Sequence, residues 1–461
     1  MKFLRKTLLL TACAAAPLLA ASHAQASAAP AEAWQNLFDG KTLTGWKRLG
    51  GTADYKVENG AIVGTSVPNS GNTFLVTEKE YGDYDLELDV KIDSPTSNSG
   101  VQTRSHFDAA AQPGKVYGRQ VEVDPSARSW SGGIYDEARR QWLYPLDLHP
   151  QAKTAFKVGQ YNHLKLECLG NELKTWVNGV PAAYVVDPID PSGFIGLQVH
   201  AVGEAAEAGQ KVYFKNIRIK TTNLTPSAFP ADIYVVNFVP NYLSTYEKQH
   251  GWKLLFDGKS PAGWRSAKGT AFPAQGWQIA DGTLSVLPSE GKEAANGGDI
   301  VTQAEYKAFD LSFEFKLTPG ANSGVKYFVT LAEQTDGSAI GLEYQVLDDA
   351  LHPDAKLGRD GDRTLASLYD LKTADKPARF VHPIGEWNVG RVVVHPNNHV
   401  EHYLNGAKVL EYDRGSKEFR DLVAQSKYHI WPNFGEAKAG HLLLQDHGNR
   451  VSFRSIKLKE L

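Results

Sequence analysis

The sequence predicts an all-β protein built from two tandem β-sandwiches or jelly rolls, and three observations support this fold class. Residues 84–92 (YDLELDVKI) alternate apolar and polar side chains, and residues 309–317 (FDLSFEFKL) repeat the pattern. Such period-two alternation is typical of half-buried antiparallel strands. The segment LFDGKTLTGW at 37–46 returns as LFDGKSPAGW at 255–264, which indicates an internal duplication. Gly, Asn and Pro separate many short apolar runs, and we find no long segment with helical periodicity.

The first 26 residues are predicted to be a secretory signal peptide. A short basic start that contains Lys2, Arg5 and Lys6 is followed by an apolar run and by small residues that fit a cleavage site. We therefore expect the mature chain to be periplasmic or secreted. Cys13 ends a short lipoprotein-like box, so a lipid anchor is the less favoured alternative. No later run is long and apolar enough for a transmembrane span.

The repeated motifs give the domain organisation in chain order. After the signal peptide at 1–26 we expect a first jelly-roll domain at 31–221, a linker at 222–249 and a second jelly-roll domain at 250–461. The linker matches nothing else in the chain, and its mixed polarity favours an ordered segment that packs on a domain. Motifs that both halves share are NSGV at 98–101 and 322–325, Tyr-Asp at 135–136 and 369–370, Asn-Gly at 178–179 and 405–406, and the strands FKNIRIK at 214–220 and FRSIKLK at 453–459.

Each half also contains a predicted hairpin. Residues 163–169 turn back into 172–179 in the first half, and residues 388–395 turn back into 399–406 in the second. Cys168 lies on the apolar side of the first hairpin and is the only cysteine of the mature chain. We expect it to be a small buried apolar residue, so the fold must be held by packing and not by a disulfide.

Composition and charge exclude some functional classes. The 461 residues are 42% hydrophobic with a net charge of −3, which are globular values that suit two or three domains. We find no basic stripe with interleaved aromatic residues, so a nucleic-acid partner is not expected.

One polar strand face recurs with a histidine in both halves. In SGFIGLQVH, Gln198 and His200 share the face opposite the apolar side chains, and Gln445 and His447 do the same in the second half. Each histidine is a candidate for the site, and the alternative is a histidine satisfied by its neighbours on the exposed side of a sheet.

A second polar strand carries acids and amides. In YGRQVEVD, Gln120, Glu122 and Asp124 share one face, which must be solvated or line a cleft. In the second half Glu343 and Gln345 share the corresponding face, with acid and amide exchanged, and Asp348 follows. A glycosidase that uses paired carboxylates needs two acids flanking the bond, and this spacing weakens that interpretation for the second half.

Aromatic and basic residues surround these strands. Aromatic faces beside carboxylates and amides suit carbohydrate, whose C–H faces stack while its hydroxyls need directional partners. A basic residue follows each NSGV turn and is a candidate for stabilising an oxyanion, with a solvated cation as the alternative. The aromatic and histidine candidates are Trp130, Tyr369, His429 and Trp431, and the basic candidates are Arg104 and Lys326.

The metal interpretation finds little support in the sequence. His399 and His402 are close in sequence, yet they lie on opposite faces of their strand, and no zinc-type spacing occurs elsewhere. We therefore predict no cofactor, with a bound divalent metal such as a structural calcium ion left as an open alternative.

The motifs LFDG…GW, NSGV, the G-x-E-x-Q strand at 341–345, GEWN at 385–388, LNG, LQDHG and F-R-x-I-K occur in an order that resembles the 3-keto-disaccharide hydrolase family. This family is also described as 3-keto-glucoside 1,2-lyase/3-keto-2-hydroxy-glucal hydratase. The resemblance covers nearly all of 34–221 and 250–461, and the second copy has the fuller pattern. It implies two concanavalin A-like jelly rolls and an oxidised (3-keto) glycoside or disaccharide as substrate, with a functional link to a sugar 3-dehydrogenase.

The chemistry that the resemblance implies needs one base and one oxyanion site. A ketone at C3 makes the C2 proton acidic, so a base removes it, a donor or cation stabilises the enolate, and the C1 substituent leaves before water adds back. We expect Glu343 or His447 to be the base, with Lys326 and Gln345 near the enolate. The expected counterparts in the first half are Glu122, Asp124 and His200. The alternatives are a lectin-like carbohydrate-binding protein and a purely structural adhesion protein.

Overall fold

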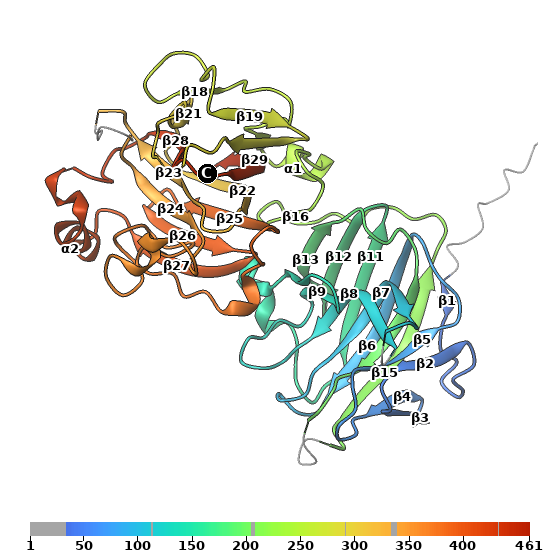
Figure 1. Cartoon of the computed structure of the whole chain (residues 1–461). Helices are drawn as coiled ribbons and strands as arrows, with labels where there is room; N and C mark the ends of the chain where they lie inside the picture. The colour runs from blue at the N-terminus through green and yellow to red at the C-terminus, as the bar shows by residue number, and fades with distance from the viewer. Residues whose placement is uncertain (1–33, 112–113, 204–207, 291, 333–338, 432) are drawn as a thin grey trace, which may run out of the picture.

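The computed structural model describes residues 34–461 except 112–113, 204–207, 291, 333–338 and 432. Two β-sandwiches follow one another along the chain (Figure 1), which confirms the predicted all-β fold class. The predicted signal peptide and Cys13 lie outside the described residues. Within the described part of the chain, no helix has the length and apolar character needed to span a membrane.

The first sandwich contains, among the described residues, a nine-stranded and a seven-stranded sheet. The order of the larger sheet is β16-β13-β12-β11-β6-β15-β4-β3, with β1 paired to β15, and that of the smaller is β10-β9-β8-β7-β14-β5-β2. Its strands are β1 (Gln35–Asn36), β2 (Trp46–Gly50), β3 (Asp54–Glu58), β4 (Ala61–Thr65), β5 (Thr73–Thr77), β6 (Tyr84–Ile92), β7 (Ser99–Asp108), β8 (Lys115–Val123), β9 (Ile134–Glu137), β10 (Gln141–Tyr144), β11 (Asn162–Leu169), β12 (Glu172–Val177), β13 (Val180–Val186), β14 (Phe194–Val199), β15 (Lys211–Lys220) and β16 (Val236–Asn237).

The second sandwich has, over the same described residues, an eight-stranded and a five-stranded sheet. Their orders are β19-β20-β29-β22-β25-β26-β27, with β17 paired to β29, and β18-β21-β28-β23-β24. Its strands are β17 (Trp252–Leu254), β18 (Trp264–Ser266), β19 (Trp277–Ala280), β20 (Thr283–Val286), β21 (Ile300–Thr302), β22 (Phe309–Leu317), β23 (Asn322–Val329), β24 (Leu342–Leu347), β25 (Trp387–Val394), β26 (His399–Leu404), β27 (Ala407–Asp413), β28 (His441–Leu444) and β29 (Val451–Glu460).

Short helices complete the two sandwiches. The longest is α2, which lies between β27 and β28, and α1 lies in the linker. The helical segments are η1 (Leu146–Leu148), η2 (Pro150–Thr154), α1 (Thr245–Gln249), η4 (Pro353–Lys356), η5 (Ala378–Phe380), α2 (Lys417–Gln425) and η6 (Lys427–Ile430).

The alternation that predicts the strands is reproduced in their burial. In β6 the side chains of Leu86, Leu88 and Val90 are fully buried, whereas those of Glu87 and Asp89 between them are half-buried. Burying each such aliphatic side chain stabilises the fold by roughly 1.5–3 kcal/mol. Cys168 is buried and free, as predicted.

The duplicated LFDG…GW segment forms the same turn at the start of each sandwich. One carboxylate oxygen of Asp39 accepts two backbone N–H bonds at 2.8 and 2.7 Å, and that of Asp257 accepts the corresponding pair at 2.8 Å each. The indoles of Trp46 and Trp264 each donate at 2.7 Å to the carbonyl nine residues earlier. The motif therefore closes the first turn of each sandwich.

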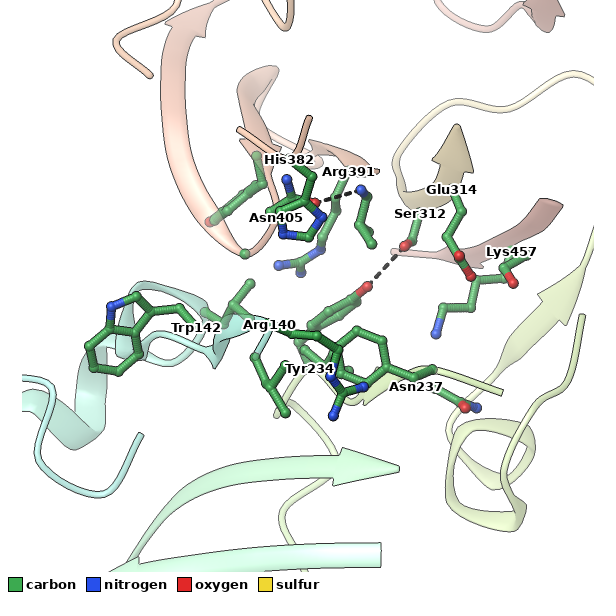
Figure 2. Close-up of a pocket in the computed structure, with 18 residues that line it drawn as sticks. Arg140, Trp142, Tyr234, Asn237, Ser312, Glu314, His382, Arg391, Asn405 and Lys457 are labelled. Atoms are coloured by element: carbon green, nitrogen blue, oxygen red, sulfur yellow. Dashed lines mark hydrogen bonds between the residues drawn. The ribbon is translucent and has the colours of Figure 1, made fainter. Parts of the chain in front are cut away.

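The linker packs against both sandwiches. Strand β16 pairs in parallel with β13, and α1 begins at a capping box of Ser244 and Glu247. The hydroxyl of Tyr234 donates to Ser312 of β22 at 2.9 Å, as Figure 2 shows. The guanidinium of Arg391 lies 4.0 Å from the centre of the Tyr234 ring, over its face.

The two sandwiches share one hydrophobic core at their junction. The core cluster of the first sandwich continues into five buried residues of the second, which are Trp252, Phe380, Val393, Tyr403 and Ala407. The small cavity in Figure 2 lies at this junction, away from the polar strands that the sequence singles out. The junction is therefore a packed interface.

Candidate active site

A cavity of about 360 Å³ lies over the five-stranded sheet of the second sandwich. It gathers most of the residues that the sequence predicts for the second half. The predicted residues that line it are Lys326, Glu343, Gln345, Tyr369, Trp431, Gln445 and His447.

Strand pairing places the acid opposite a lysine. In the β23–β24 ladder Lys326 pairs with Glu343, and Gly324 pairs with Gln345. A side chain at position 324 would meet the Glu343 carboxylate, because an added Cβ would lie 1.9 Å from Oε1. The glycine of the NSGV motif thus makes room for the acid beside it.

Burial raises the pKa of Glu343 into the range that suits proton transfer. The Glu343 side chain is 4% exposed, and this burial raises its pKa to about 7. The nearby ammonium groups of Lys326 and Lys427 oppose the rise, whereas the carboxylates of Glu293 and Asp299 add to it. A carboxyl with a pKa near neutrality can accept a proton from a weak carbon acid and give it up again.

An ion-paired network holds the wall beside Glu343. The Arg363 guanidinium donates to Asp354 at 2.9 Å and to Asp370 at 2.7 Å. The Tyr369 hydroxyl donates to the other oxygen of Asp354 at 2.8 Å, and the backbone N–H of Lys427 donates to Asp370 at 2.7 Å. Two cavity residues, Tyr369 and Lys427, are therefore fixed by the same arginine.

Other polar groups of the cavity keep unused hydrogen-bonding capacity. The side-chain oxygen of Asn322 and Nδ1 of His447 are buried and have no hydrogen-bond partner within the described part of the chain. The Gln445 amide donates to Glu293 at 3.2 Å at the rim. Unpartnered buried acceptors and donors are costly unless a ligand or water satisfies them, so they favour a polar ligand.

The structure adds cavity residues that the sequence analysis does not identify. Asn322 belongs to the duplicated NSGV motif, and Lys427 and Tyr428 lie in the segment KYHIWPNFGE beside the predicted Trp431. The sequence therefore contained motifs that could have identified these three residues. Glu293 lies in a turn and Asp354 in η4, and no repeated motif points to them.

Two predicted residues of the second half lie outside this cavity. Asp348 accepts backbone N–H bonds from Gly320 at 2.8 Å and Ala350 at 3.0 Å, so its carboxylate closes a turn. His429 lines a separate neighbouring cavity, and its Nδ1 lies 2.7 Å from the carbonyl oxygen of Ser426.

The pairing register of the first sandwich corrects one predicted equivalence. Gln102 faces Gln120 as Lys326 faces Glu343, so Gln102 and not Arg104 is the counterpart of the lysine. Arg104 has a left-handed φ of 47° in the region where the β7–β8 register shifts. Its buried guanidinium donates to Asp83 at 2.8 Å and to backbone carbonyls.

In the first sandwich, three amide side chains and one acid are linked by a series of hydrogen bonds. Glu122 accepts from Asn98 at 2.8 Å and from Gln120 at 2.9 Å, and Gln120 accepts from Gln102 at 2.8 Å. Burial raises the pKa of Glu122 to about 7, while the bonds from Gln120 and Asn98 oppose the rise. Both side-chain partners of this acid are neutral.

Asp124 and Trp130 have structural contacts in the first sandwich. Asp124 accepts from the Ser126 N–H at 3.1 Å and forms an ion pair with Arg128 at 2.7 Å. Trp130 is buried and packs on Trp142, with 4.6 Å between the ring centres.

Gln198 and His200 do not join Glu122 in one cavity. Gln198 is buried, whereas His200 is exposed just after β14 and lines a cavity of about 210 Å³ with Asn98. Glu122 does not line that cavity. The first sandwich therefore leaves its predicted site residues dispersed.

Among the described residues, one group of side chains is spaced closely enough to hold a metal ion, and it lies outside the cavity. His399, Glu401 and Glu411 offer ligand atoms within 4.8 Å of one another on β26 and β27. The ammonium of Lys408 lies 3.3 Å from Glu401 and 2.5 Å from Glu411, so a cation already occupies the space between the two carboxylates.

Comparison with known proteins gives the relationship of this chain. A family model described as the 3-keto-alpha-glucoside-1,2-lyase-like domain matches residues 33–220 and again residues 251–459. The chain belongs to this family. It carries two tandem copies of the domain, as the duplicated motifs predict.

Individual relatives match about one copy in length. A curated 3-keto-disaccharide hydrolase from Bacteroides thetaiotaomicron is 37% identical over 232 residues, which are 46% of this chain and 79% of that protein. A solved structure from Parabacteroides distasonis, described provisionally as a glycosyl hydrolase, is 30% identical. It covers 48% of this chain and 99% of that chain, with a TM-score of 0.41.

Proposed function

We propose that the second domain cleaves 3-keto-glycosides by elimination across C1 and C2 followed by hydration of the product. One observation carries this proposal: Glu343, a buried carboxyl with a pKa of about 7, lies directly across its strand pair from Lys326 in a cavity of about 360 Å³. The function of the curated relative from Bacteroides thetaiotaomicron supports the same substrate class.

The elimination step uses one base and one cation. Glu343 takes the C2 proton, and the bonding pair forms the enolate of the C3 ketone beside the ammonium of Lys326. When the C3 carbonyl forms again, the pair moves into a C1–C2 double bond and the C1–O bond breaks. The departing oxygen takes a proton from solvent, so an alcohol leaves, and the water that adds to C1 in the next step gives a proton back to solvent.

The hydration step reverses the proton transfer. Water adds to C1 and C2 receives a proton, which gives a free 3-keto sugar and balances as net hydrolysis. Glu343 carries a proton after the first step, this proton exchanges with solvent, and the carboxyl is then placed to protonate C2. His447, with its unpartnered Nδ1, lies in the same cavity and is our choice for activating the water.

The environments of the other acids favour this route over direct hydrolysis. Paired-carboxylate glycosidases need two acids that flank the glycosidic bond. The Asp354 carboxylate is held by Tyr369 and Arg363, and Glu293 is exposed and bonded to Gln445. Glu343 therefore lacks a second acid free to act beside it.

A labelling experiment tests the proposal. The protein is incubated with methyl 3-keto-glucoside in D₂O, and the early product is analysed for deuterium at C2 and for released methanol. Elimination and hydration predict deuterium at C2 in step with methanol release, above the exchange seen without protein. Methanol release with a retained C2 proton would instead identify direct displacement at C1. Binding with neither event would favour the lectin-like alternative.

The first domain is better suited to binding than to turnover. Its buried acid Glu122 is held by two neutral amides, and its counterpart of Lys326 is the neutral Gln102. We propose carbohydrate binding without chemistry for this domain.

A 3-keto substrate must come from oxidation of a sugar at C3, so a sugar 3-dehydrogenase is the proposed functional partner. We also propose that residues 1–26 direct the chain to the periplasm or outside the cell.

A further inference from the structure

Lys427 brings a second ammonium group to the cavity that holds Glu343. This ammonium lies 4.3 Å from the centre of the Tyr369 ring and 5.3 Å from that of the Tyr428 ring. Within the described part of the chain, it forms neither an ion pair nor a hydrogen bond. An aromatic face attracts a cation without taking up its N–H groups as a hydrogen-bond acceptor does, so Lys427 keeps its donors for a ligand.

An insertion in the second sandwich supplies this lysine. β27 ends at Asp413 and β28 begins at His441, and α2 and η6, which starts at Lys427, lie between them. In the first sandwich the corresponding strands β13 and β14 are separated only by residues 187–193. The backbone N–H of Lys427 donates to Asp370 at 2.7 Å, so the backbone is held by a bond that does not involve the lysine side chain.

The two ammonium groups of the cavity approach Glu343 from different elements. Lys326 faces it across the β23–β24 pair, whereas Lys427 comes from the insertion. Both oppose the rise in the pKa of Glu343, which places both charges near its carboxyl group. In the substrate, C2 lies between C1 and C3. A base for C2 with two cations near it can therefore have one donor for the C3 oxygen and another for the C1 oxygen.

Proton transfer to the departing C1 oxygen needs a donor that is not already engaged. The hydroxyl of Tyr369 donates to Asp354 at 2.8 Å, and the ammonium of Lys326 donates to a backbone carbonyl at 3.0 Å. The side-chain amides of the cavity are not acids. His447 already has a role in the hydration step. Lys427 is therefore the cavity residue best placed to supply this proton.

We propose that Lys427 is the general acid of the elimination and protonates the C1 oxygen as the C1–O bond breaks. This inference rests on the proposed function, because it assigns a donor to one step of that mechanism. The N–H bond breaks and an O–H bond forms, so the alcohol leaves and Lys427 becomes a neutral amine. The amine then takes a proton from solvent, which remains the net source of the proton.

The surroundings of the ammonium favour this role. Burial lowers the pKa of Lys427, and the charge of Lys326 adds to the decrease, whereas that of Glu343 opposes it. A lower pKa makes the ammonium a stronger acid towards the oxygen of a departing alkoxide.

The leaving-group dependence tests the assignment. We measure kcat/KM for the methyl and 4-nitrophenyl derivatives of 3-keto-glucose, above the rising limb of the pH profile and after subtraction of the rate without protein. Lys427→Met should lower kcat/KM for the methyl derivative by about 10²-fold, because a general acid contributes roughly 10²–10⁴-fold. For the 4-nitrophenyl derivative the loss should be less than about threefold, because nitrophenolate leaves without a proton.

Isotope exchange separates proton removal at C2 from cleavage at C1. In D₂O, recovered methyl 3-keto-glucoside is analysed for deuterium at C2 and compared with the methanol released. In Lys427→Met the enolate forms but loses its C1 substituent slowly, so it returns to substrate. The ratio of exchange to release should therefore rise by about tenfold or more. Lys326→Gln should instead slow exchange and release together, because it weakens stabilisation of the enolate.

Two further variants separate the proton from the charge. Lys427→Arg keeps a positive charge, but a guanidinium does not give up its proton in this pH range. It should keep the pH of the rising limb near that of wild type and show the raised exchange-to-release ratio of Lys427→Met. Lys417→Met is the matched control, because this lysine of the same insertion has a side chain that is 88% exposed and lines no part of the cavity. It should keep the wild-type ratio.

The outcomes separate this inference from the proposed function. A loss in Lys427→Met that is equal for the methyl and 4-nitrophenyl derivatives overturns the general acid, and so does methanol release by Lys427→Arg at the wild-type rate. Both results would leave the elimination mechanism intact. Wild-type protein that neither exchanges the C2 hydrogen nor releases either leaving group contradicts the proposed function itself.

Discussion

Glu343 faces a lysine across its strand pair, whereas Gln120, at the same place in the first sandwich, faces a glutamine. Both sandwiches keep an asparagine at the start of the NSGV motif, and both bury one carboxyl with a pKa raised to about 7. The first surrounds its carboxyl with amides, and the second surrounds it with ammonium groups and open space. The first difference between the two copies is therefore the charge placed on one strand face of a shared sandwich.

The insertion between β27 and β28 is the second difference. It brings Lys427 to the rim, where the ammonium lies 4.3 Å from the Tyr369 ring centre. No segment of comparable length lies between β13 and β14, so the predicted site residues of the first sandwich have no such cover. A closed cavity excludes water and strengthens electrostatic effects inside it.

The largest expected effect comes from neutralising the two buried acids in turn. Glu343→Gln should lower kcat by about 10³-fold, because a general base contributes roughly 10²–10⁴-fold. Glu122→Gln should change kcat less than about twofold, because its domain lacks the adjacent cation. Methanol release from methyl 3-keto-glucoside measures both. A large loss in Glu122→Gln with an intact fold would show that the first domain also catalyses the reaction.

Exchanging the residues opposite the acids is the next test. Lys326→Gln copies the first sandwich and should lower kcat by about 10²-fold through loss of enolate stabilisation. Gln102→Lys, the reverse change, should bring no activity to a Glu343→Gln protein, because Gln120 in that domain is not an acid. Turnover restored by Gln102→Lys would mean that one cation is enough to convert one copy into the other.

The pH dependence sharpens the role of the ammonium groups. Glu343 must be deprotonated to act as a base, so kcat/KM should rise with pH through about 7. Lys427→Met removes a charge that holds the pKa down, so the rising limb should move to higher pH. Glu293→Gln removes a charge that raises it, so the limb should move to lower pH. A limb unaffected by either change would assign it to another group.

The smallest effect concerns stability and the buried His402 of the second sandwich. Burial lowers the pKa of His402 to about 4, and Thr175 of the first sandwich occupies its place in the hairpin. The unfolded chain therefore takes up a proton at this histidine first as pH falls below about 6.5, and the contribution of His402 to folded-state stability falls by up to ~3 kcal/mol towards pH 4. Glu122 and Glu343, whose pKa values burial raises to about 7, act in the opposite direction over this range.

The difference between wild type and His402→Gln isolates the histidine. Denaturant unfolding at pH 7 and pH 4.5 should show a smaller pH-dependent loss of free energy in His402→Gln than in wild type. Equal losses in the two proteins would show that His402 does not control the acid limb.

Much of the fold could be predicted from the sequence because antiparallel strands with one buried face carry a period of two. Glu343, Gln345 and Lys326 could be found for the same reason, since strand phase and the NSGV duplication place them together. Arg104 could not be placed, because a shift in the β7–β8 register turns its side chain away, although parity along the strand suggests otherwise. Such an irregularity leaves no clear mark in the local sequence.

The remaining site residues come from tertiary structure. Lys427 reaches the cavity because the inserted segment that contains α2 folds over it. Asp354 is held by Arg363 and Tyr369, and none of these three residues lies in a strand whose apolar and polar side chains alternate. Trp130 could not be distinguished from a sugar-binding tryptophan, because an aromatic residue beside a Gly-Gly turn suits either role. Its burial against Trp142 is decided by the packing of a neighbouring strand.

The core that crosses the junction has a consequence for how such a chain evolves. Phe380, Val393, Tyr403 and Ala407 of the second copy are covered by the first copy and the linker. A descendant that lost the first copy would expose this apolar surface to water and to aggregation. Loss of the first copy is therefore expected to destabilise the second, which gives a reason to keep the first copy that is independent of any activity of its own.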